Sequence, residues 1–513
     1  MNVLLIYPAF PNTFWSFKYA LKFVGKKSAY PPLGLITVAA MFPEEFQKRL
    51  VDVNVDKLTE NDLDWADMAF IGAMAIQRAS AKHIIGRCRA RGLKVAAGGP
   101  LFTAEPDTFE DVDHMILDEA ELTLPSFLED LKNGHPKKVY RASGFCDLHD
   151  TPLPVWSLVR MSKYASMSVQ FSRGCPFNCD FCNVTALFGH SVRMKTPQQV
   201  IAELDSLYAS GWHSSIFFVD DNFIGNKIFL KRRLLPALIK WRRNKKGCVF
   251  YTEASINLAD DPELMDMMLR AGFDSVFIGI ESPEEGSLTE CQKVQNKHRD
   301  LLHDVRRIQR AGLQVLGGFI VGFDSDTPST FQRHIDFIQK SGIVTAMVGI
   351  LQAPPGTRLF DRLTKENRVV GPISGDNVDG TTNIVPKMGL STLLEGYRAI
   401  MAHIYSPRKY YQRVRTLLTE FGAPQARTPM DFQRFLAFFR SGLRLGILGR
   451  ERFEYWHLLL WTLVRKPRQL PLAITLTIYG HHFRRICELY ILRGERRHHA
   501  GNIYTQGYLQ AAG

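Results

Sequence analysis

The chain has 513 residues, and its 64 Lys and Arg against 51 acidic residues give a formal net charge of +13. A hydrophobic fraction of 45% and a charged fraction of 22% are ordinary for globular proteins and exclude a disordered or fibrous chain. No run of 18 apolar residues occurs, and the start of the chain lacks the basic flank of a signal peptide. We therefore expect neither a membrane span nor a leader.

Cysteine and charge are both unevenly placed. Three of the eight Cys are clustered and five are scattered, which favours a reducing, cytoplasmic location over a disulfide framework. Between residues 434 and 497 there are 13 Lys and Arg against 4 Asp and Glu, so most of the basic excess lies near the C-terminus. Basic charge of this kind usually belongs to a solvated surface. The more specific alternative is a surface that binds anionic lipid or nucleic acid.

Residues 1–140 alternate short apolar runs with helical stretches, the pattern of a doubly wound, Rossmann-like parallel sheet. The predicted strands are residues 3–7, 50–55, 68–74, 93–97 and 114–117. Ligands bind such sheets beyond the carboxyl ends of the strands, where the loops contain Gln77, Gly98, Gly99, Pro100 and Glu119. Gly98 and Gly99 allow a bulky ligand to approach the backbone, although a tight turn explains them equally well.

Residues 141–166 contain spaced prolines and are predicted to form an extended linker. An apolar run at 167–171 then leads to Cys175, Cys179 and Cys182, with three and two residues between successive thiols. Gly174 and Pro176 favour a loop here. Three thiolates so close together can hold three irons of an iron–sulfur cube and leave the fourth iron open to another ligand.

Two other interpretations of these cysteines, a structural zinc site and a disulfide framework, have less support. A structural zinc site needs four protein ligands, and His190 is the only nearby candidate for the fourth. A disulfide framework needs even pairing and an oxidising compartment.

Strand and helix alternate again through residue 389, and six β/α units predict a complete or partial parallel barrel. The predicted strands are residues 167–171, 215–219, 249–251, 275–280, 316–321 and 346–351. Polar groups and glycines lie at or near the carboxyl ends of these strands, among them Asp220, Asn222, Glu253, Glu281 and Gly318. For each acid, the alternative to a ligand contact is a structural role as a helix cap or as a charge on a surface loop. Arg193 and Lys195 are expected to be solvated, and the alternative for either is a contact with substrate or SAM.

From residue 390 to 513 the pattern becomes helical, with predicted helices at residues 390–405, 410–420, 431–445, 453–464 and 472–490. Aromatic and basic residues interleave there, as in a helix that lies on a membrane surface. The alternative is an ordinary packed helical domain. The pairs His481-His482 and His498-His499 are expected to lie on the surface.

The Cys-x3-Cys-x2-Cys spacing, with Phe181 directly before the last Cys, resembles the signature of the radical S-adenosylmethionine (SAM) family. The resemblance implies a 4Fe–4S cluster on Cys175, Cys179 and Cys182, whose open iron binds SAM and cleaves it to an adenosyl radical. It also implies a radical SAM core at 167–389 and SAM contacts from six residues: Phe181, Asp220, Asn222, Glu253, Glu281 and Gly318.

The first 140 residues resemble the cobalamin (B12)-binding domain that precedes many radical SAM cores. The resemblance implies cobalamin contacts from Gln77, Gly98, Gly99, Pro100 and Glu119. The Asp-x-His-x-x-Gly motif that supplies a histidine to cobalt is absent, and the only His in the first 110 residues is His83. We therefore expect no histidine ligand, and a degenerate domain without cofactor is the competing interpretation.

The order of the parts resembles the group of hopanoid C-2 methylases, with the likeness carried by residues 196–200, 218–226 and 277–281. It implies that methylcobalamin delivers a methyl group to an unactivated carbon of an apolar, lipid-like substrate. An electron donor such as flavodoxin or ferredoxin and peripheral membrane contact through the C-terminal helices are also implied. The alternatives are a non-methylating enzyme, such as an oxidative cyclase of tetrapyrroles, and a metal-containing nucleic-acid-binding module. We expect no nucleic acid, because the basic excess lies far along the chain from the cysteines.

Overall fold

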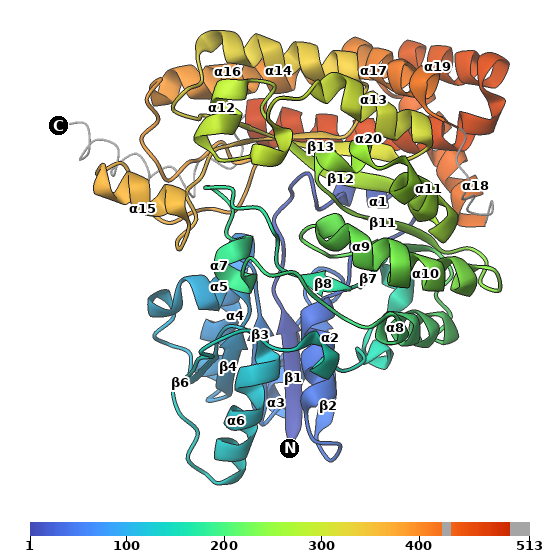
Figure 1. Ribbon diagram of the computed structural model, residues 1–513. Coiled ribbons are helices and arrows are strands. Elements are labelled where there is room, and N and C mark those ends of the chain that lie inside the picture. Colours follow the sequence, from blue (N-terminus) through green and yellow to red (C-terminus); the bar gives the residue numbers. More distant parts are fainter. Residues whose placement is uncertain (423–431, 493–513) are drawn as a thin grey trace.

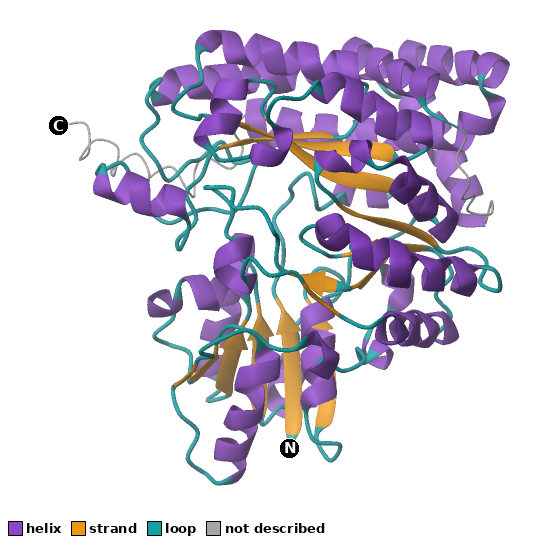
Figure 2. Ribbon diagram, in the orientation of Figure 1, coloured by secondary structure: helices purple, strands orange, loops and turns teal. Residues whose placement is uncertain are grey.

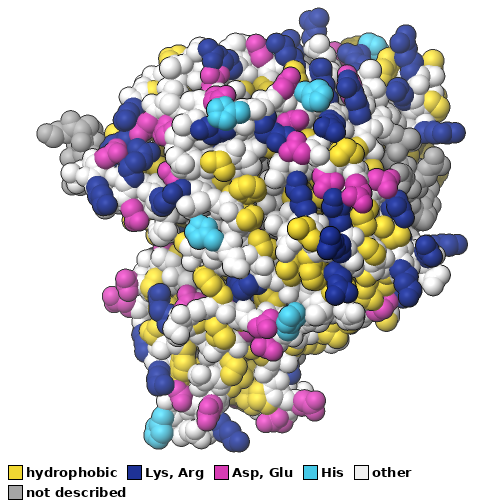
Figure 3. Space-filling view, in the orientation of Figure 1, with side chains coloured by type: hydrophobic (Ala, Val, Ile, Leu, Met, Phe, Trp, Pro, Cys, Tyr) yellow, Lys and Arg dark blue, Asp and Glu magenta, His cyan; other side chains and the backbone are white. Residues whose placement is uncertain are grey.

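The computed structural model describes residues 1–422 and 432–492. Two bodies are evident, a smaller one built on the first sheet and a larger one built on the second sheet and most of the helices (Figure 1). The strands of the first sheet point their carboxyl ends toward the larger body (Figure 2). Lys and Arg side chains are spread over the larger body on the face seen in Figure 3.

The first sheet is parallel and six-stranded, in the order β2-β1-β3-β4-β5-β6. Its strands are β1 (Asn2–Tyr7), β2 (Gln47–Asp52), β3 (Met68–Gly72), β4 (Lys94–Gly98), β5 (His114–Ile116) and β6 (Val139–Tyr140). The strand order reverses at β1, because β2 is added on one side of β1 and β3 on the other. Ligands of doubly wound sheets bind beyond the carboxyl ends of the strands at that point. The loops after β1 and β3 are therefore the expected ligand edge.

Alternate side chains of β1 enter two separate cores. Leu4 and Ile6 lie in the core on one face, and Val3 and Leu5 lie in the core on the other. Helices cover both faces: α2 (Leu33–Met41), α3 (Glu60–Trp65), α4 (Arg78–Ala90), α5 (Pro100–Ala104) and α6 (Ala120–Lys132). The sheet is buried on both sides, which explains its continuous apolar strands.

The second sheet is also parallel and six-stranded, in the order β14-β13-β12-β11-β10-β7. Its strands are β7 (Met167–Val169), β10 (Ser215–Phe218), β11 (Val249–Glu253), β12 (Phe273–Glu281), β13 (Gln314–Val321) and β14 (Ala346–Ile350). The first and last strands do not pair with each other, so the sheet is an open, partial (β/α)6 barrel. A short antiparallel pair, β8 (Ser172–Arg173) and β9 (Arg193–Met194), flanks the cysteine loop.

Helices form the outer layer of this barrel. They are α8 (Pro197–Ala209), α9 (Lys227–Phe229), α10 (Leu235–Arg242), α11 (Pro262–Ala271), α12 (Glu285–Glu290), α13 (Leu301–Ala311) and α14 (Pro328–Ser341). Two further helices lie outside this layer: α7 (Val184–Phe188) follows the cysteine loop, and α15 (Arg358–Lys365) follows β14 (Figure 1). The start of α8 shows why they begin where they do. The Thr196 hydroxyl accepts a hydrogen bond from the Gln199 amide, and Pro197 occupies the first helical position.

The fold class predicted from the sequence is confirmed, with every predicted strand present within a few residues. The structure adds β6, which is only two residues long and has no periodicity to reveal it. The predicted linker contains only short 3-10 turns, and Tyr164 near its end donates a hydrogen bond of 2.8 Å to Asp52 of the first sheet. The domain boundaries at 140, 166 and 389 remain predictions.

The C-terminal helices continue the outer layer of the barrel. They are α16 (Leu390–Ile404), α17 (Pro407–Glu420), α18 (Phe432–Ser441), α19 (Arg452–Arg465) and α20 (Leu470–Ile486), with π-helical turns at Gly442–Ile447 and Cys487–Leu492. Their buried side chains belong to the same core as the barrel strands. Tyr405 donates a 2.6 Å hydrogen bond to the Ala346 carbonyl of β14. This region is thus a packed helical layer on its inner side.

A segment of the first body also enters this core. Phe14, after β1, is fully buried beside Phe483 of α20, and α1 (Lys18–Leu21) packs against the same helix. His482 is fully buried there, with Nε2 3.0 Å from the Phe14 carbonyl, and His481 is also buried. The prediction of a surface His481-His482 pair was therefore wrong, because α1 covers that face of α20. His498-His499 lie outside the described residues.

Among residues 1–422 and 432–492, no helix has both the length and the apolar character needed to cross a bilayer.

We predict that Arg413 of α17 anchors the helical layer. Its guanidinium is fully buried and donates to the side chain of Gln339 and to the carbonyls of Ile404 and Val344. Arg413→Ala leaves these acceptors without a donor and should lower the free energy of unfolding by about 2–4 kcal/mol. Denaturant unfolding measures this. Arg408→Ala, at an exposed position of α17, is the control and should change it by less than about 0.5 kcal/mol.

Candidate functional site

The cysteine loop lies between the two bodies, directly after β7 and β8 and before α7 (Figure 1). Cys179 is buried, while Cys175 and Cys182 keep some accessible surface. The thiol of Cys182 lies close enough to those of Cys179 and Cys175 for their charges to interact. Near the loop, the Arg358 guanidinium donates to the Asn178 carbonyl and pairs with Asp180.

The chemistry of this donor set fits an iron–sulfur cluster. Burial raises the pKa of all three thiols, that of Cys182 to about 12, so thiolates form there only if cations offset the burial. The irons of a cluster supply that charge. No group of three or more His, Cys, Asp or Glu in the described part is arranged around a single ion. A cluster does not require one, because each thiolate binds a different iron.

Lys293 is the main cation near the thiols. Its ammonium lies 2.6 Å from Glu281 Oε1 and 5.9 Å from the centre of the Phe181 ring. Although burial would lower the pKa of Lys293, the Glu281 carboxylate and the neighbouring thiols raise it above its ordinary value. Gln295 Nε2 lies 3.7 Å from Cys179 Sγ, and its Oε1 is buried without a partner in the described structure. The loop after β12 thus presents a cation and an amide to the cluster site.

The backbone around Glu281 is shaped for this pair. The register between β12 and β13 shifts at Gly279–Glu281, and Glu281 has a left-handed φ of 61°. A side chain on Gly279 would collide with the Glu281 carboxylate and the Lys293 ammonium. Strain of this kind persists in folded proteins mainly where function requires it.

Asp220, a predicted SAM contact, is buried and is hydrogen-bonded to the segment before the cysteine loop. Asp220 is 1% exposed, and it accepts hydrogen bonds from the Ser172 amide and hydroxyl and from the Phe171 amide. The neighbouring Asp221 accepts one of 3.2 Å from the Gly174 amide. Both carboxylates therefore hold the backbone that leads into the cysteine loop, and in this structure they act as positioning residues.

Glu253 is the predicted acid that remains available. It ends β11 deep in the molecule, keeps some accessible surface, and has no hydrogen bond or ion pair to another described residue. Burial, and then the charge of Asp221, raises its pKa to about 8. The Asn222 amide oxygen lies 3.2 Å from the Ser255 amide, which fixes it beside the end of β11. A ligand cation or hydroxyl would find an unpaired carboxyl group here.

The remaining two predicted SAM contacts are apolar. The Phe181 ring packs edge-on against Phe323, with centres 6.3 Å apart. Gly318 lies on β13 where a Cβ would come within 2.8 Å of the Phe277 ring, so its lack of a side chain already serves the packing of that ring. The structure therefore brings Phe181, Glu281 and the cysteines together and places Gly318 on the adjacent strand.

A buried cluster of four charges joins the cysteine loop to the first sheet. Arg173, two residues before Cys175, lies 2.8 Å from Glu119 and 2.7 Å from Glu121. Arg193 of β9 lies 2.9 Å from Glu119 as well. We call these four residues the interdomain clamp. Arg193 is therefore not solvated as expected, and neither is Lys195, which is buried against Glu203.

The ligand edge of the first sheet contains the predicted cobalamin contacts. Gln77 is fully buried and donates to the Pro8 carbonyl across the point where the strand order reverses. A Cβ on Gly98 would come within 2.5 Å of the Ile116 carbonyl, so this glycine is also required by the sheet itself. Gly99 has a left-handed φ of 92° and leads into Pro100, the first residue of α5. Glu119 is engaged in the interdomain clamp.

A later segment lies over this edge. Arg78, at the start of α4, pairs with Glu105 and donates a 2.8 Å hydrogen bond to the Ile373 carbonyl. Gly375 approaches the backbone of Ile76 so closely that a Cβ would come within 3.0 Å of its nitrogen. The loop after α15 therefore lies against the loop after β3. His83 is exposed on α4.

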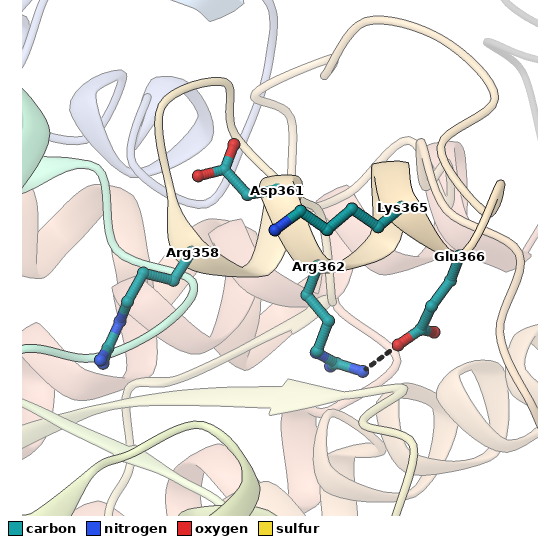
Figure 4. Close-up of a pocket in the computed structure, with 5 residues that line it drawn as sticks. All are labelled: Arg358, Asp361, Arg362, Lys365 and Glu366. Carbon is teal, nitrogen blue, oxygen red and sulfur yellow. Dashed lines mark hydrogen bonds and ion pairs between the residues drawn. The ribbon is translucent and has the colours of Figure 1, made fainter.

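A separate open hollow of about 520 Å³ lies along α15. Figure 4 shows that its lining side chains all come from this helix and the residue after it: Arg358, Asp361, Arg362, Lys365 and Glu366. Arg362 and Glu366 pair with each other across it. The mixed charge of this hollow and its lining by a single helix distinguish it from the site at the carboxyl ends of the barrel strands, which we call the strand-end site.

Sequence reasoning missed Lys293, Gln295 and the clamp. Lys293 and Gln295 follow a short helix after β12, in a stretch without a motif. Arg173 stands two residues before Cys175, and its proximity to the cysteines was the only available signal. Its partners Glu119 and Glu121 are more than 50 residues away, and no local pattern connects them.

We predict that the interdomain clamp holds the cysteine loop in place. Arg173→Gln leaves Glu119 and Glu121 buried with only Arg193 to balance their charges. Removing one partner of a buried ion pair lowers the free energy of unfolding by about 3–5 kcal/mol. Amide hydrogen exchange should become faster across residues 171–182. The exposed substitution Arg232→Gln is the control. Unchanged exchange in Arg173→Gln would contradict the assigned role.

We also predict that Glu253 makes the cofactor-free protein less stable at high pH. Its folded pKa, about 8, lies above the ordinary value of 4.5, so its stabilising effect is complete below pH 4.5 and is lost as pH rises through 8. The free energy of unfolding should fall by a few kcal/mol, at about 1.4 kcal/mol per pKa unit. Glu253→Gln should flatten this slope in denaturant titrations, and the exposed Glu263→Gln should not.

Comparisons with known proteins identify the family of this chain. Residues 169–338 match the Radical SAM superfamily, and residues 357–495 match a domain of unknown function, DUF4070. An uncharacterized methyltransferase of Synechocystis sp. is 40% identical over 94% of this chain and 91% of its own length. The hopanoid C-2 methylase of Rhodopseudomonas palustris is 31% identical over 100% of this chain and 97% of its own length.

Among solved structures, the cobalamin-dependent SAM radical enzyme OxsB with bound aqua-cobalamin aligns with a TM-score of 0.61. The alignment covers 99% of this chain and 84% of OxsB at 15% identity, which shows a shared fold. Two full-length relatives above 30% identity show more than a shared fold. The chain belongs to the cobalamin-binding radical SAM family of methyltransferases.

Proposed function

We propose that this protein transfers a methyl group from SAM, by way of methylcobalamin, to an unactivated carbon of a hopanoid-like or other apolar lipid substrate. The observation that carries the proposal is the interdomain clamp, because it fixes the cysteine loop against the ligand edge of the first sheet. The likeness to a hopanoid C-2 methylase along the whole chain supports the substrate class.

In this proposal Cys175, Cys179 and Cys182 hold a 4Fe–4S cluster. When bound, the cluster with SAM supplies a radical that takes hydrogen from the substrate, and the corrinoid supplies the methyl group. The Asp220 and Asp221 carboxylates fix the backbone before the first cysteine, so the thiols are oriented before any cofactor arrives. Such preorganisation is what a site for a reactive species requires.

The polar groups at the strand ends would bind SAM. Glu253 has an unpaired carboxyl group suited to the SAM ammonium or ribose hydroxyls. Lys293, balanced by Glu281, offers a cation for the SAM carboxylate. Asn222, Phe181 and Gly318 would complete the contacts. The apolar core of the barrel and helical layer would keep water from the radical.

The corrinoid would lie on the loops of the first sheet at Gln77, Gly98, Gly99 and Pro100. Small residues there leave room for a flat ring, and Met74 offers apolar surface with 48% of it exposed. The Glu119 carboxylate is held by two arginines, and we assign it the role of placing this edge relative to the cysteine loop. His83 is exposed on α4, and in this proposal it makes no contact with cobalt.

The protein would need a one-electron donor such as flavodoxin or ferredoxin to reduce the cluster. All eight cysteines are free, which suits a reducing cytoplasm. We propose that the protein works there, at the cytoplasmic face of the membrane that contains its lipid substrate.

Labelled SAM tests the proposal. Protein reconstituted anaerobically with iron, sulfide and cobalamin is incubated with methyl-deuterated SAM, a reductant and a detergent-dispersed membrane lipid extract. Mass spectrometry should find a lipid that has gained one labelled methyl group. The matched control variants are Cys182→Ala, which should abolish the product, and Cys88→Ala, a buried thiol of α4, which should retain it.

Release of 5′-deoxyadenosine without label in any lipid would contradict methyl transfer. That result would favour non-methylating radical chemistry, such as oxidative ring closure of a tetrapyrrole. Product formation by Cys182→Ala would contradict the cluster assignment itself.

A further inference from the structure

The outer side of the C-terminal layer exposes an unusual number of large apolar side chains. Ten of the nineteen that are exposed among the described residues lie between 435 and 464. We call this set the apolar ridge: Phe435, Phe439, Leu443, Ile447, Leu448, Phe453, Trp456, Leu460, Leu463 and Val464. Several are almost fully open, with exposed fractions of 75% for Leu448, 76% for Phe453 and 80% for Val464.

The ridge follows two helical stripes. Phe435, Phe439, Leu443 and Ile447 recur every four residues along α18 and the π-helical turn, and the second stripe runs along α19 from Phe453. The two stripes meet where the Trp456 indole donates a 3.0 Å hydrogen bond to the Gly446 carbonyl. The inner faces of the same helices are buried in the barrel core, and among residues 1–422 and 432–492 no packing covers the ridge.

The charges around the ridge are almost all positive. Residues 435–475 include seven Lys and Arg and only two acids, Glu451 and Glu454. Glu451 is buried against Arg484, so it adds no exposed negative charge. Arg450, Arg465 and Arg468 make no ion pair with any residue that the structure describes. Exposed apolar groups flanked by unpaired cations suit an anionic lipid surface, where the apolar side chains enter the interface and the cations meet headgroups.

The same charges argue against two other partners. A symmetric contact between two copies of this chain would bring like-charged rims together. Nucleic acid would engage the arginines but would leave the large aliphatic side chains of the ridge without apolar partners. Figure 1 shows α18 and α19 at the outer edge of the larger body, away from the first sheet.

We propose that the apolar ridge is a docking face for an anionic bilayer surface, with the helices lying along the interface. The inference rests on the exposed surface and its charge and is independent of the methyl transfer proposed above. It adds a physical route to an apolar substrate, because the protein would meet the lipid at the bilayer itself.

Vesicle co-sedimentation tests the docking face. The probes are full-length, cofactor-loaded protein and vesicles of phosphatidylcholine alone or mixed with phosphatidylglycerol. Wild type should bind the mixed vesicles more tightly, and added salt should weaken that binding. The double variant Leu448→Glu/Phe453→Glu should bind at least about tenfold more weakly, because charged residues replace two inserting side chains. Ile228→Glu, equally open at 66% exposure on α9, is the matched control and should bind as wild type does.

A second variant separates charge from apolar contact. Arg450→Gln/Arg465→Gln/Arg468→Gln should lose about fivefold in affinity for mixed vesicles per arginine and should not change binding to neutral vesicles. Unfolding curves should match those of wild type, since all substituted residues are exposed.

Either of two results would overturn the proposal: wild type that fails to bind mixed vesicles, or a double variant that binds them like wild type. A stable dimer in light scattering that the double variant dissociates would also overturn it and would assign the ridge to self-association. The methyl-transfer assay uses detergent-dispersed lipid, so a failure of docking and a failure of the proposed chemistry can be told apart.

Discussion

The structure depends on one buried electrostatic contact between its two bodies, the interdomain clamp. Arg173 and Arg193 leave the strands that flank the cysteine loop and meet Glu119 and Glu121 at the edge of the first sheet. Two positive and two negative charges balance one another inside the protein, and each removed partner would leave a buried charge uncompensated. The clamp therefore fixes a loop suited to one cofactor against a sheet edge suited to another.

The charges of the strand-end site, unlike those of the clamp, do not balance, because carboxyl groups are in excess there. Asp220, Asp221 and Glu253 are buried close together, and burial raises the pKa of each, to about 7, 6 and 8. Asp220 and Asp221 are engaged by the backbone before the cysteines, whereas Glu253 has no such partner. A cationic ligand would relieve this excess of carboxyl groups, as the proposed binding of the SAM ammonium requires.

Periodicity and motif spacing were enough to predict the six barrel strands, five of the six strands of the first sheet and the cysteine loop. These features are local, since alternation and thiol spacing are visible within a few residues. The clamp, the Lys293–Glu281 pair and the entry of Phe14 into the barrel core depend on residues that meet only after folding. The buried His482 was mispredicted for that reason, because its cover, α1, comes from the opposite end of the chain.

In the proposed function, the cysteine loop holds an iron–sulfur cube beside a corrinoid held by the first sheet. The most direct measurement is the metal and sulfide content of protein reconstituted anaerobically with cobalamin and then freed of unbound cofactor. We expect about four irons, about four labile sulfides and about one cobalt per chain. Zinc in place of iron, with no labile sulfide, would contradict it.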